Sequence, residues 1–192
     1  MAFQKRSLSQ EELAQEHQLV QAAQNNPRRF SALYERYYEQ MFYFIYKRVD
    51  REDICADICS EVFLKAMKNL KKYQFRGVPF SAWLYRIAIN EVNQFFRTNK
   101  QQRSISLETT QIGEMMDEAE APRDESGMQQ MIQALPQLKD EDLQMVELRF
   151  FEQLPFRQIA EIYGITENNA KVRMYRILGK LRKLMDPSRV NA

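Results

Sequence analysis

The stretch LPFRQIAEIYGITENNAKVRMYRILGKLRKLM, residues 154–185, decides the fold of the C-terminal part of the chain. Apolar residues recur at helical spacing on both sides of Gly164, and a glycine there allows a left-handed turn at little steric cost. The residues that we expect to share one core are Ile159, Ala160, Ile165, Ala170 and Met174. This pattern predicts a helix-turn-helix whose second helix suits the major groove of DNA.

The predicted second helix presents polar and basic side chains on its outer face. The candidate DNA-contacting residues are Thr166, Asn168, Asn169, Lys171, Val172, Arg173, Tyr175 and Arg176. Thr166 is placed to cap the helix, whose first backbone amides can then bind a phosphate. Asparagine pairs well with adenine and lysine with guanine, whereas Arg173 and Arg176 favour phosphates. Tyr175 fits either DNA contact or packing, and a solvated helix of a protein-interaction domain is the alternative for the whole set.

Composition places the chain among globular proteins rather than disordered or membrane-spanning ones. Of 192 residues, 44% are hydrophobic and 28% are charged, and no apolar run approaches the roughly 18 residues that span a bilayer. The first twelve residues lack the apolar core of a signal peptide. We therefore expect a cytoplasmic protein without membrane insertion.

Residues that commonly carry catalysis are scarce. Cys55 and Cys59 are the two cysteines, and His17 is the one histidine. They cannot form a disulfide framework, and they leave too few ligands for a metal site or a nucleophilic triad. The five glycines form no phosphate-binding loop. We expect no enzyme, no cofactor and no metal. The two thiols are interpreted as structural, with redox sensing or metal binding as the alternative.

Charge is distributed unevenly along the chain although the net charge is only +2. Residues 1–100 carry 16 basic and 11 acidic side chains, and residues 163–192 carry 7 and 2. Between them, residues 101–127 carry 2 basic and 7 acidic side chains. Two basic ends separated by an acidic stretch suggest a nucleic-acid contact at each end.

Helical periodicity dominates, and strand signals are absent, so the predicted fold class is all-α with two small helical domains. A capping box at Ser9 and Glu12 starts the first helix, and Asp50 is expected to cap the third. Gly77 and Pro79 predict a loop over residues 71–79. The expected organisation is a helical domain at 1–100, an acidic and partly extended linker at 101–127, and a helix-turn-helix domain at 128–192.

Four passages in this order resemble the group IV, or extracytoplasmic-function, sigma factors of bacterial RNA polymerase. They are FSALYERYYEQMFYFIYKRV (30–49), CADICSEVFLKAMKNL (55–70), FSAWLYRIAINEVNQFFR (80–97) and the helix-turn-helix. The first resembles the start of sigma region 2, the second its polymerase-binding helix, the third its −10-reading helix, and the last region 4.2. The resemblance covers about residues 17–185 and implies a protein that confers promoter specificity on core polymerase and is itself not an enzyme.

The resemblance also implies partners and site residues. The set implied to dock on the clamp helices of core polymerase is Asp57, Ile58, Glu61, Phe63 and Leu64. Part of the C-terminal domain would bind the polymerase flap. The family often has an anti-sigma factor, which remains an open partner here. The alternative for the third helix is a solvated surface with Phe63 in the core.

Basic and aromatic residues interleave between the third and fourth helices. The set implied to read and melt the −10 element is Lys72, Tyr73, Phe75, Arg76, Trp83, Arg86 and Asn90. Cations suit phosphates, rings suit unpaired bases, and a loop pocket can hold a base that has left the stack. Alternatively, Trp83 anchors the core and the lysines serve solubility.

Two other functions fit the residues alone. A conventional helix-turn-helix regulator would bind duplex DNA tightly without polymerase, often as a dimer. A protein-interaction module would bind polymerase or an anti-sigma factor without reading DNA. Changing Lys171 and Arg173 to alanine discriminates, because a sigma factor should then lose promoter use and keep polymerase binding.

Overall fold

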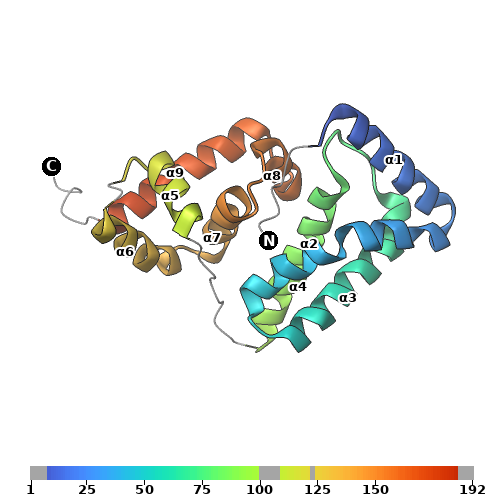
Figure 1. Cartoon of the computed structure of the whole chain (residues 1–192), viewed down its shortest axis with the longest axis horizontal. Helices are drawn as coiled ribbons and strands as arrows, with labels where there is room; N and C mark the ends of the chain where they lie inside the picture. The colour runs from blue at the N-terminus through green and yellow to red at the C-terminus, as the bar shows by residue number, and fades with distance from the viewer. Residues whose placement is uncertain (1–7, 100–108, 122–123, 186–192) are drawn as a thin grey trace. The chain divides into compact units, whose positions relative to one another are not determined.

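The computed structural model describes residues 8–99, 109–121 and 124–185, and the regular structure within these ranges is entirely helical (Figure 1). The all-α prediction is therefore confirmed for the described chain. Contacts divide it into two compact units. The described part of the first is residues 8–99, with 161–163 grouped with it, and that of the second is 109–121, 124–160 and 164–185.

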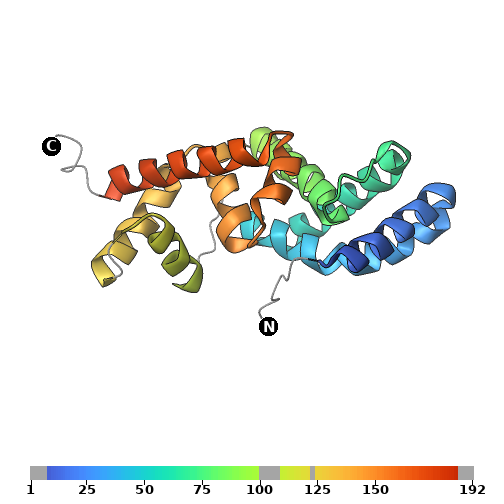
Figure 2. The same ribbon diagram turned by 90° about the horizontal axis from the view of Figure 1, so that it is seen from above.

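The first unit contains four α-helices and two short 3₁₀ turns within its described range. They are α1 (Gln10–Asn25), η1 (Pro27–Phe30), α2 (Ser31–Val49), α3 (Glu52–Asn69), η2 (Leu70–Lys72) and α4 (Phe80–Asn99). Helices α2, α3 and α4 pack against one another, and α1 lies against η1 and η2 (Figures 1 and 2). The largest side chains of the core include Leu33, Met41, Phe44, Ile45, Phe80, Leu84 and Tyr85.

Local signals set some of the helix ends in this unit. The capping box at the start of α1 is present, with Ser9 and Glu12 each bonded to the other's backbone N–H. The prediction that Asp50 caps the third helix is wrong. Asp50 instead ends α2 in a left-handed conformation, with φ of 50°, and α3 begins at Glu52. Aspartate tolerates this conformation better than most residues, so it can turn the chain sharply between two helices.

Apart from the last one, the helices of the second unit are short. They are α5 (Thr109–Glu118), α6 (Glu125–Ala134), η3 (Leu135–Gln137), α7 (Asp140–Val146), the π-helical turn η4 (Glu147–Phe151), α8 (Phe156–Tyr163) and α9 (Glu167–Met185). Helix α9 packs on α6 and α7, and α5 packs on α6 and η4 (Figure 2).

Helix α5 lies inside the stretch that we expected to be a partly extended linker. Ile112, Met115, Met116 and Ala119 are each at most 2% exposed. Their spacing forms one helical stripe, which the acidic residues between them conceal in a composition profile. Arg149 holds the end of the helix through an ion pair to Glu118 at 2.8 Å. Part of the expected linker is therefore a packed element of the second unit.

The helix-turn-helix forms as predicted from α8 and α9. Gly164 adopts a φ of 66°, and the Ile165 backbone N–H donates to the Ala160 carbonyl at 3.0 Å. Ile159, Ala170 and Met174 are at most 1% exposed, so the two helices share the expected core. A residue with a side chain at position 164 would be strained even though the space beside it is open.

Candidate nucleic-acid interface

The recognition helix α9 presents a polar face beyond its cap. Thr166 caps the helix as expected, because its Oγ1 accepts the Asn169 backbone N–H at 3.2 Å. The predicted contact residues that are exposed on this face are Asn168, Asn169, Lys171, Val172, Tyr175 and Arg176. Tyr175 is 66% exposed, so its ring is available to a ligand and contributes little to the core.

Arg173 differs from the rest of the predicted set. Its guanidinium lies 3.1 Å from a carboxylate oxygen of Glu141 and 3.6 Å from one of Asp142, both on α7. Lys180 approaches the other oxygen of the buried Asp142 at 2.5 Å. These contacts fasten α9 to α7, so Arg173 contributes to helix packing, and its predicted contact with DNA stays a prediction.

In the cationic run at the end of α9, some side chains likewise take part in packing and others stay exposed. Arg182 donates from Nε to the Ala119 carbonyl at 2.8 Å and pairs with Glu120 at 3.0 Å. Within the described residues, Arg176 and Lys183 are exposed and have no ion-pair partner. The charge available to phosphates on this helix is therefore smaller than its sequence suggests.

A groove of about 340 Å³ lies between α3 and α4 in the first unit. We refer to it as the α3–α4 groove; its walls are Lys65, Asn69, Lys72, Trp83, Arg86, Ile87, Asn90 and Glu91. Four residues of the predicted −10 set meet there: Lys72, Trp83, Arg86 and Asn90. Cations, an indole ring and an amide around one cavity are the groups that bind single-stranded DNA.

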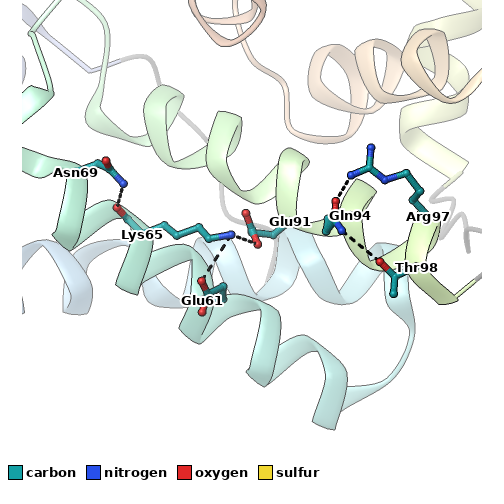
Figure 3. Close-up of polar contacts among 7 residues, drawn as sticks. All are labelled: Glu61, Lys65, Asn69, Glu91, Gln94, Arg97 and Thr98. Atoms are coloured by element: carbon teal, nitrogen blue, oxygen red, sulfur yellow. Dashed lines mark hydrogen bonds and ion pairs between the residues drawn. The ribbon is translucent and has the colours of Figure 1, made fainter.

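One carboxylate interrupts the cationic lining of the groove. Lys65 on α3 lies 2.6 Å from Glu91 on α4 and 3.6 Å from Glu61 on its own helix (Figure 3). The hydrogen bond to Glu91 raises the pKa of Lys65, because it stabilises the charged ammonium. Farther along α4, Gln94 bonds with Arg97 and Thr98 (Figure 3). The Lys65–Glu91 pair thus joins the two walls of the groove and neutralises its acidic residue.

The remaining residues of the −10 set lie on the loop before α4. Tyr73 is half-buried, and its ring lies 5.1 Å from Phe80 and 5.2 Å from Trp83. Burial raises the pKa of the Tyr73 hydroxyl. Trp83 packs on these rings, as the core-anchor interpretation expected, and also lines the groove. Phe75 and Arg76 are exposed on the loop.

Helix α3 exposes only part of the predicted polymerase-binding set. Asp57 and Leu64 are exposed and Glu61 is half-buried; we name these three residues the docking strip. Ile58 and Phe63 are 8% and 3% exposed, so neither side chain presents a surface to a partner. Phe63 packs in the core, as the alternative interpretation expected.

The structure also assigns residues that sequence reasoning missed. Lys65, Asn69, Ile87 and Glu91 line the groove. A signal for Lys65 was present, since it follows Glu61 by one helical turn, but its pairing with Glu91 is not local.

No group of three or more His, Cys, Asp or Glu side chains in the described chain is arranged to hold a metal ion. Among the same residues, no helix is both long and apolar enough to cross a membrane.

The two surfaces define an all-helical protein with nucleic-acid-binding features in each unit. One unit carries a cationic, aromatic-lined groove, and the other carries a helix-turn-helix with an exposed polar recognition face. Comparison with known proteins narrows this class.

Two family models match the chain, Sigma-70 region 2 at residues 33–102 and Sigma-70, region 4 at residues 128–181. The ECF RNA polymerase sigma factor BldN of Streptomyces coelicolor is 30% identical over 163 residues, which span 81% of this chain and 60% of BldN. The RNA polymerase sigma-H factor of Pseudomonas aeruginosa is 29% identical over 189 residues, spanning 90% of this chain and 95% of that protein. The chain belongs to the sigma-70 family of RNA polymerase sigma factors, in its extracytoplasmic-function group.

Solved structures agree in fold. CnrH, solved in complex with the cytosolic domain of CnrY, matches with a TM-score of 0.56 and 19% identity over 90% of this chain and 98% of that chain. The sigma factor RpoE, solved with the anti-sigma factor NepR from Bartonella quintana, matches with a TM-score of 0.53 and 17% identity over 85% and 98%.

Proposed function

We propose that the chain binds core RNA polymerase in the cytoplasm and directs it to promoters, with one promoter element read by each unit. Residues 1–100 bind core polymerase and capture the melted −10 element, and residues 128–192 read the −35 element as duplex. The chain supplies binding and specificity, and polymerase supplies the chemistry. The α3–α4 groove is the observation that carries the proposal, since a conventional duplex-binding regulator has no need of a second, single-strand-binding site.

At the −10 element, the groove offsets the cost of opening the duplex. Unstacking and unpairing a base costs a few kcal/mol, and stacking on an aromatic ring returns about 1–3 kcal/mol per base. Trp83 supplies such a ring, while Lys72 and Arg86 neutralise the backbone of the same strand. Asn90 offers a hydrogen-bonding amide to a base edge. Capture of the non-template strand then makes melting favourable at one DNA sequence.

At the −35 element, the exposed face of α9 enters the major groove. Asn168 and Asn169 are placed to pair with adenine, and Lys171 with guanine. Arg176 is placed to hold a phosphate that fixes the register. Each good bidentate pair with a base contributes roughly 1–3 kcal/mol of discrimination. One recognition helix buries only a small interface on DNA, so tight promoter binding requires polymerase as well.

Two protein contacts complete the proposal. The docking strip of Asp57, Glu61 and Leu64 combines two carboxylates with an apolar side chain, which suits a basic amphipathic helix such as a polymerase clamp helix. The second unit is proposed to meet the polymerase flap. An anti-sigma factor is a further proposed partner, since CnrH and RpoE were each solved with a bound protein and the RpoE partner is an anti-sigma factor.

Reconstituted transcription tests the function directly. The chain would be added to sigma-free bacterial core polymerase on fragmented genomic DNA, and transcript starts would be mapped. We expect discrete new starts that share two upstream elements. Tight duplex binding by the chain alone with no new starts would favour a conventional regulator. Neither activity, with core of the native species, would leave a protein-interaction module.

A matched pair of variants tests the groove. Arg86→Ala should reduce open-complex formation about tenfold, because it removes a phosphate contact from the melted strand. Arg29→Ala removes another exposed arginine, from η1 outside the groove, and should change little. Permanganate reactivity of unpaired thymines measures opening. Equal effects of the two variants would count against the groove.

A further inference from the structure

Three side chains of α1 converge on the loop that precedes α4. Gln24, His17 and Glu16 contact the beginning, middle and end of the segment 70–80, and each lies in the first unit. The family model of region 2 begins at residue 33, so α1 lies outside the matched region. The loop itself carries three of the residues proposed to melt the promoter: Tyr73, Phe75 and Arg76.

Gln24 holds the beginning of the loop. Its side-chain Nε2 donates to the Leu70 carbonyl at 2.9 Å and to the Tyr73 carbonyl at 3.0 Å. The Tyr73 backbone N–H also donates to Leu70, which closes the 3₁₀ turn η2. One amide group thus bridges both ends of this turn, and a loop carbonyl that lost it would have to find water instead.

His17 and Glu16 hold the middle and the end. The His17 ring stacks on Phe75 with a centroid distance of 4.6 Å and an interplanar angle of 24°. Glu16 is 1% exposed, and its Oε2 accepts the Phe80 backbone N–H at 2.6 Å, at the first residue of α4. Its other oxygen accepts the Tyr37 hydroxyl. A carboxylate there satisfies an otherwise unpaired helix-terminal amide and complements the helix dipole.

The polar residues of α1 do more than pack against the loop. Glu16 and Gln24 are eight residues apart and therefore on the same face of α1, with the apolar Val20 between them. Polar side chains replace apolar ones at the two places where the face meets loop backbone. Glu16 and Gln24 each form a hydrogen bond with a main-chain atom of the segment 70–80. The helix therefore specifies the path of that segment and does not only cover it.

We infer that α1 preorganises the 71–79 loop for capture of an unpaired promoter base, with Gln24 and Glu16 as positioning residues. Neither residue touches the DNA; they act through Tyr73 and through the start of α4, which carries Trp83. A loop held in its binding shape loses less conformational entropy when the base enters. The inference rests on the proposed function of the loop in melting.

An abasic scan tests the inference on the holoenzyme. The probe is a single-stranded oligonucleotide of the non-template −10 element, as mapped by reconstituted transcription, with an abasic site at each position in turn. For the wild-type chain we expect one position where loss of the base weakens binding about tenfold, since base stacking and pocket contacts are lost there. That position marks the captured base.

The decisive variant is Gln24→Glu, which keeps the shape of the side chain and removes both N–H donors. We expect it to reduce the penalty at the captured position to about twofold while binding of the abasic strand stays unchanged. Gln21→Glu makes the same charge change on an exposed position of α1 and is the matched control. His17→Ala, compared with Gln18→Ala, tests the stacking contact in the same way.

The possible outcomes distinguish the proposed capture of a promoter base from the inference that α1 positions the loop. A wild-type scan with no sensitive position would overturn the capture function, and the inference with it. A sensitive position that keeps its full penalty in Gln24→Glu would overturn the inference alone. Equal weakening of intact and abasic strands would also overturn it, because a general loss of fold lowers both affinities. Thermal unfolding of each variant identifies that case.

Discussion

Cys55 and Cys59 lie one turn apart on α3, and both side chains are fully buried. The Cys55 thiol lies 3.2 Å from the Phe42 carbonyl on α2. Burial raises the pKa of each thiol to about 12. Because the thiolate is the reactive form, both groups are inert at neutral pH. The geometry favours the structural interpretation over redox sensing.

Thiol labelling checks this interpretation. At pH 8 the native chain should react with a disulfide reagent at least about 100-fold more slowly than the chain unfolded in guanidinium, because its thiolate fraction is far smaller. Both reactions are followed by the released chromophore. Fast labelling of the native chain at either residue would contradict the prediction, and Cys55→Ala and Cys59→Ala single variants assign the signal.

Alkaline stability follows from the same shifts in pKa. The unfolded thiols ionise near pH 8.5, whereas the folded ones ionise near 12, so the unfolded state releases protons first. The thiols therefore cost stability progressively as pH rises from about 8.5 to about 12. Urea midpoints over this range should fall less steeply in the Cys55→Ala/Cys59→Ala double variant. Identical slopes would contradict the assigned burial.

The Lys65–Glu91 pair sets the charge of the α3–α4 groove. Glu91→Gln removes the carboxylate and leaves the lysine, so affinity for single-stranded DNA should rise about two- to fivefold at low salt and converge with wild type at high salt. Lys65→Met should lower it, because Glu91 then repels the strand. Glu39→Gln changes net charge equally on α2, outside the groove, and serves as the control in the same anisotropy titration.

At the scale of the element, the recognition helix combines two kinds of cation. Lys171 is exposed and, among the residues that the structure describes, pairs with Glu167 on its own helix at 2.8 Å. Arg173 is tied to α7 through Glu141 and Asp142. A double substitution of Lys171 and Arg173 would therefore mix a loss of the proposed DNA contact with a loss of packing.

Single substitutions should separate these roles. Lys171→Ala should weaken promoter DNA binding severalfold with an unchanged melting temperature. Arg173→Ala should lower the free energy of unfolding by about 1 kcal/mol, because partly exposed ion pairs contribute modestly and Asp142 keeps Lys180. Parallel thermal melts and DNA titrations measure both. The assignment would be reversed if Arg173→Ala lost binding without losing stability.

Helix α5 offers a second prediction at this scale. Met116 is fully buried, so Met116→Ala should lower the free energy of unfolding by about 2–4 kcal/mol. Glu114→Ala, on the exposed side of the same helix, should stay within about 0.5 kcal/mol of wild type. Denaturant unfolding of the full chain measures both. A negligible effect of Met116→Ala would restore the expectation of an extended linker.

At the scale of the whole molecule, each unit has its own buried core. The core of the first unit draws on residues from Leu13 to Val92, and that of the second on residues from Ile112 to Met185. Units of roughly 80–100 residues can fold alone when they bury a contiguous core. The division matches the proposed division of promoter elements between the two units.

Separate expression tests the independence of the units. A fragment of residues 1–106 should be helical by circular dichroism and should unfold cooperatively, because its polar contacts from α1 to the 71–79 loop are internal. A fragment of residues 1–92 lacks the last seven residues of α4 and should be less stable. A non-cooperative or helix-poor 1–106 fragment would show that the first unit needs the rest of the chain.

Much of the helical architecture was predictable because its signals are local. The Ser9–Glu12 capping box and the turn at Gly164 each depend on residues within one or two turns of the chain. Asp50 was misassigned, since a helix cap and a left-handed helix end can be built from the same residue type. Helix α5 was missed because four apolar residues among acidic ones resemble a linker in composition.

The sequence by itself determined most of the helices, the helix-turn-helix and the family, because periodicity, caps and motif order are properties of neighbouring residues. Only the tertiary structure decided which basic side chains are occupied by ion pairs to other helices. Arg173 meets Glu141 across 32 positions, Lys180 meets Asp142 across 38, and Lys65 meets Glu91 across 26. Such pairs depend on which remote helices pack together, so one basic side chain takes part in helix packing while another, such as Lys171, stays exposed.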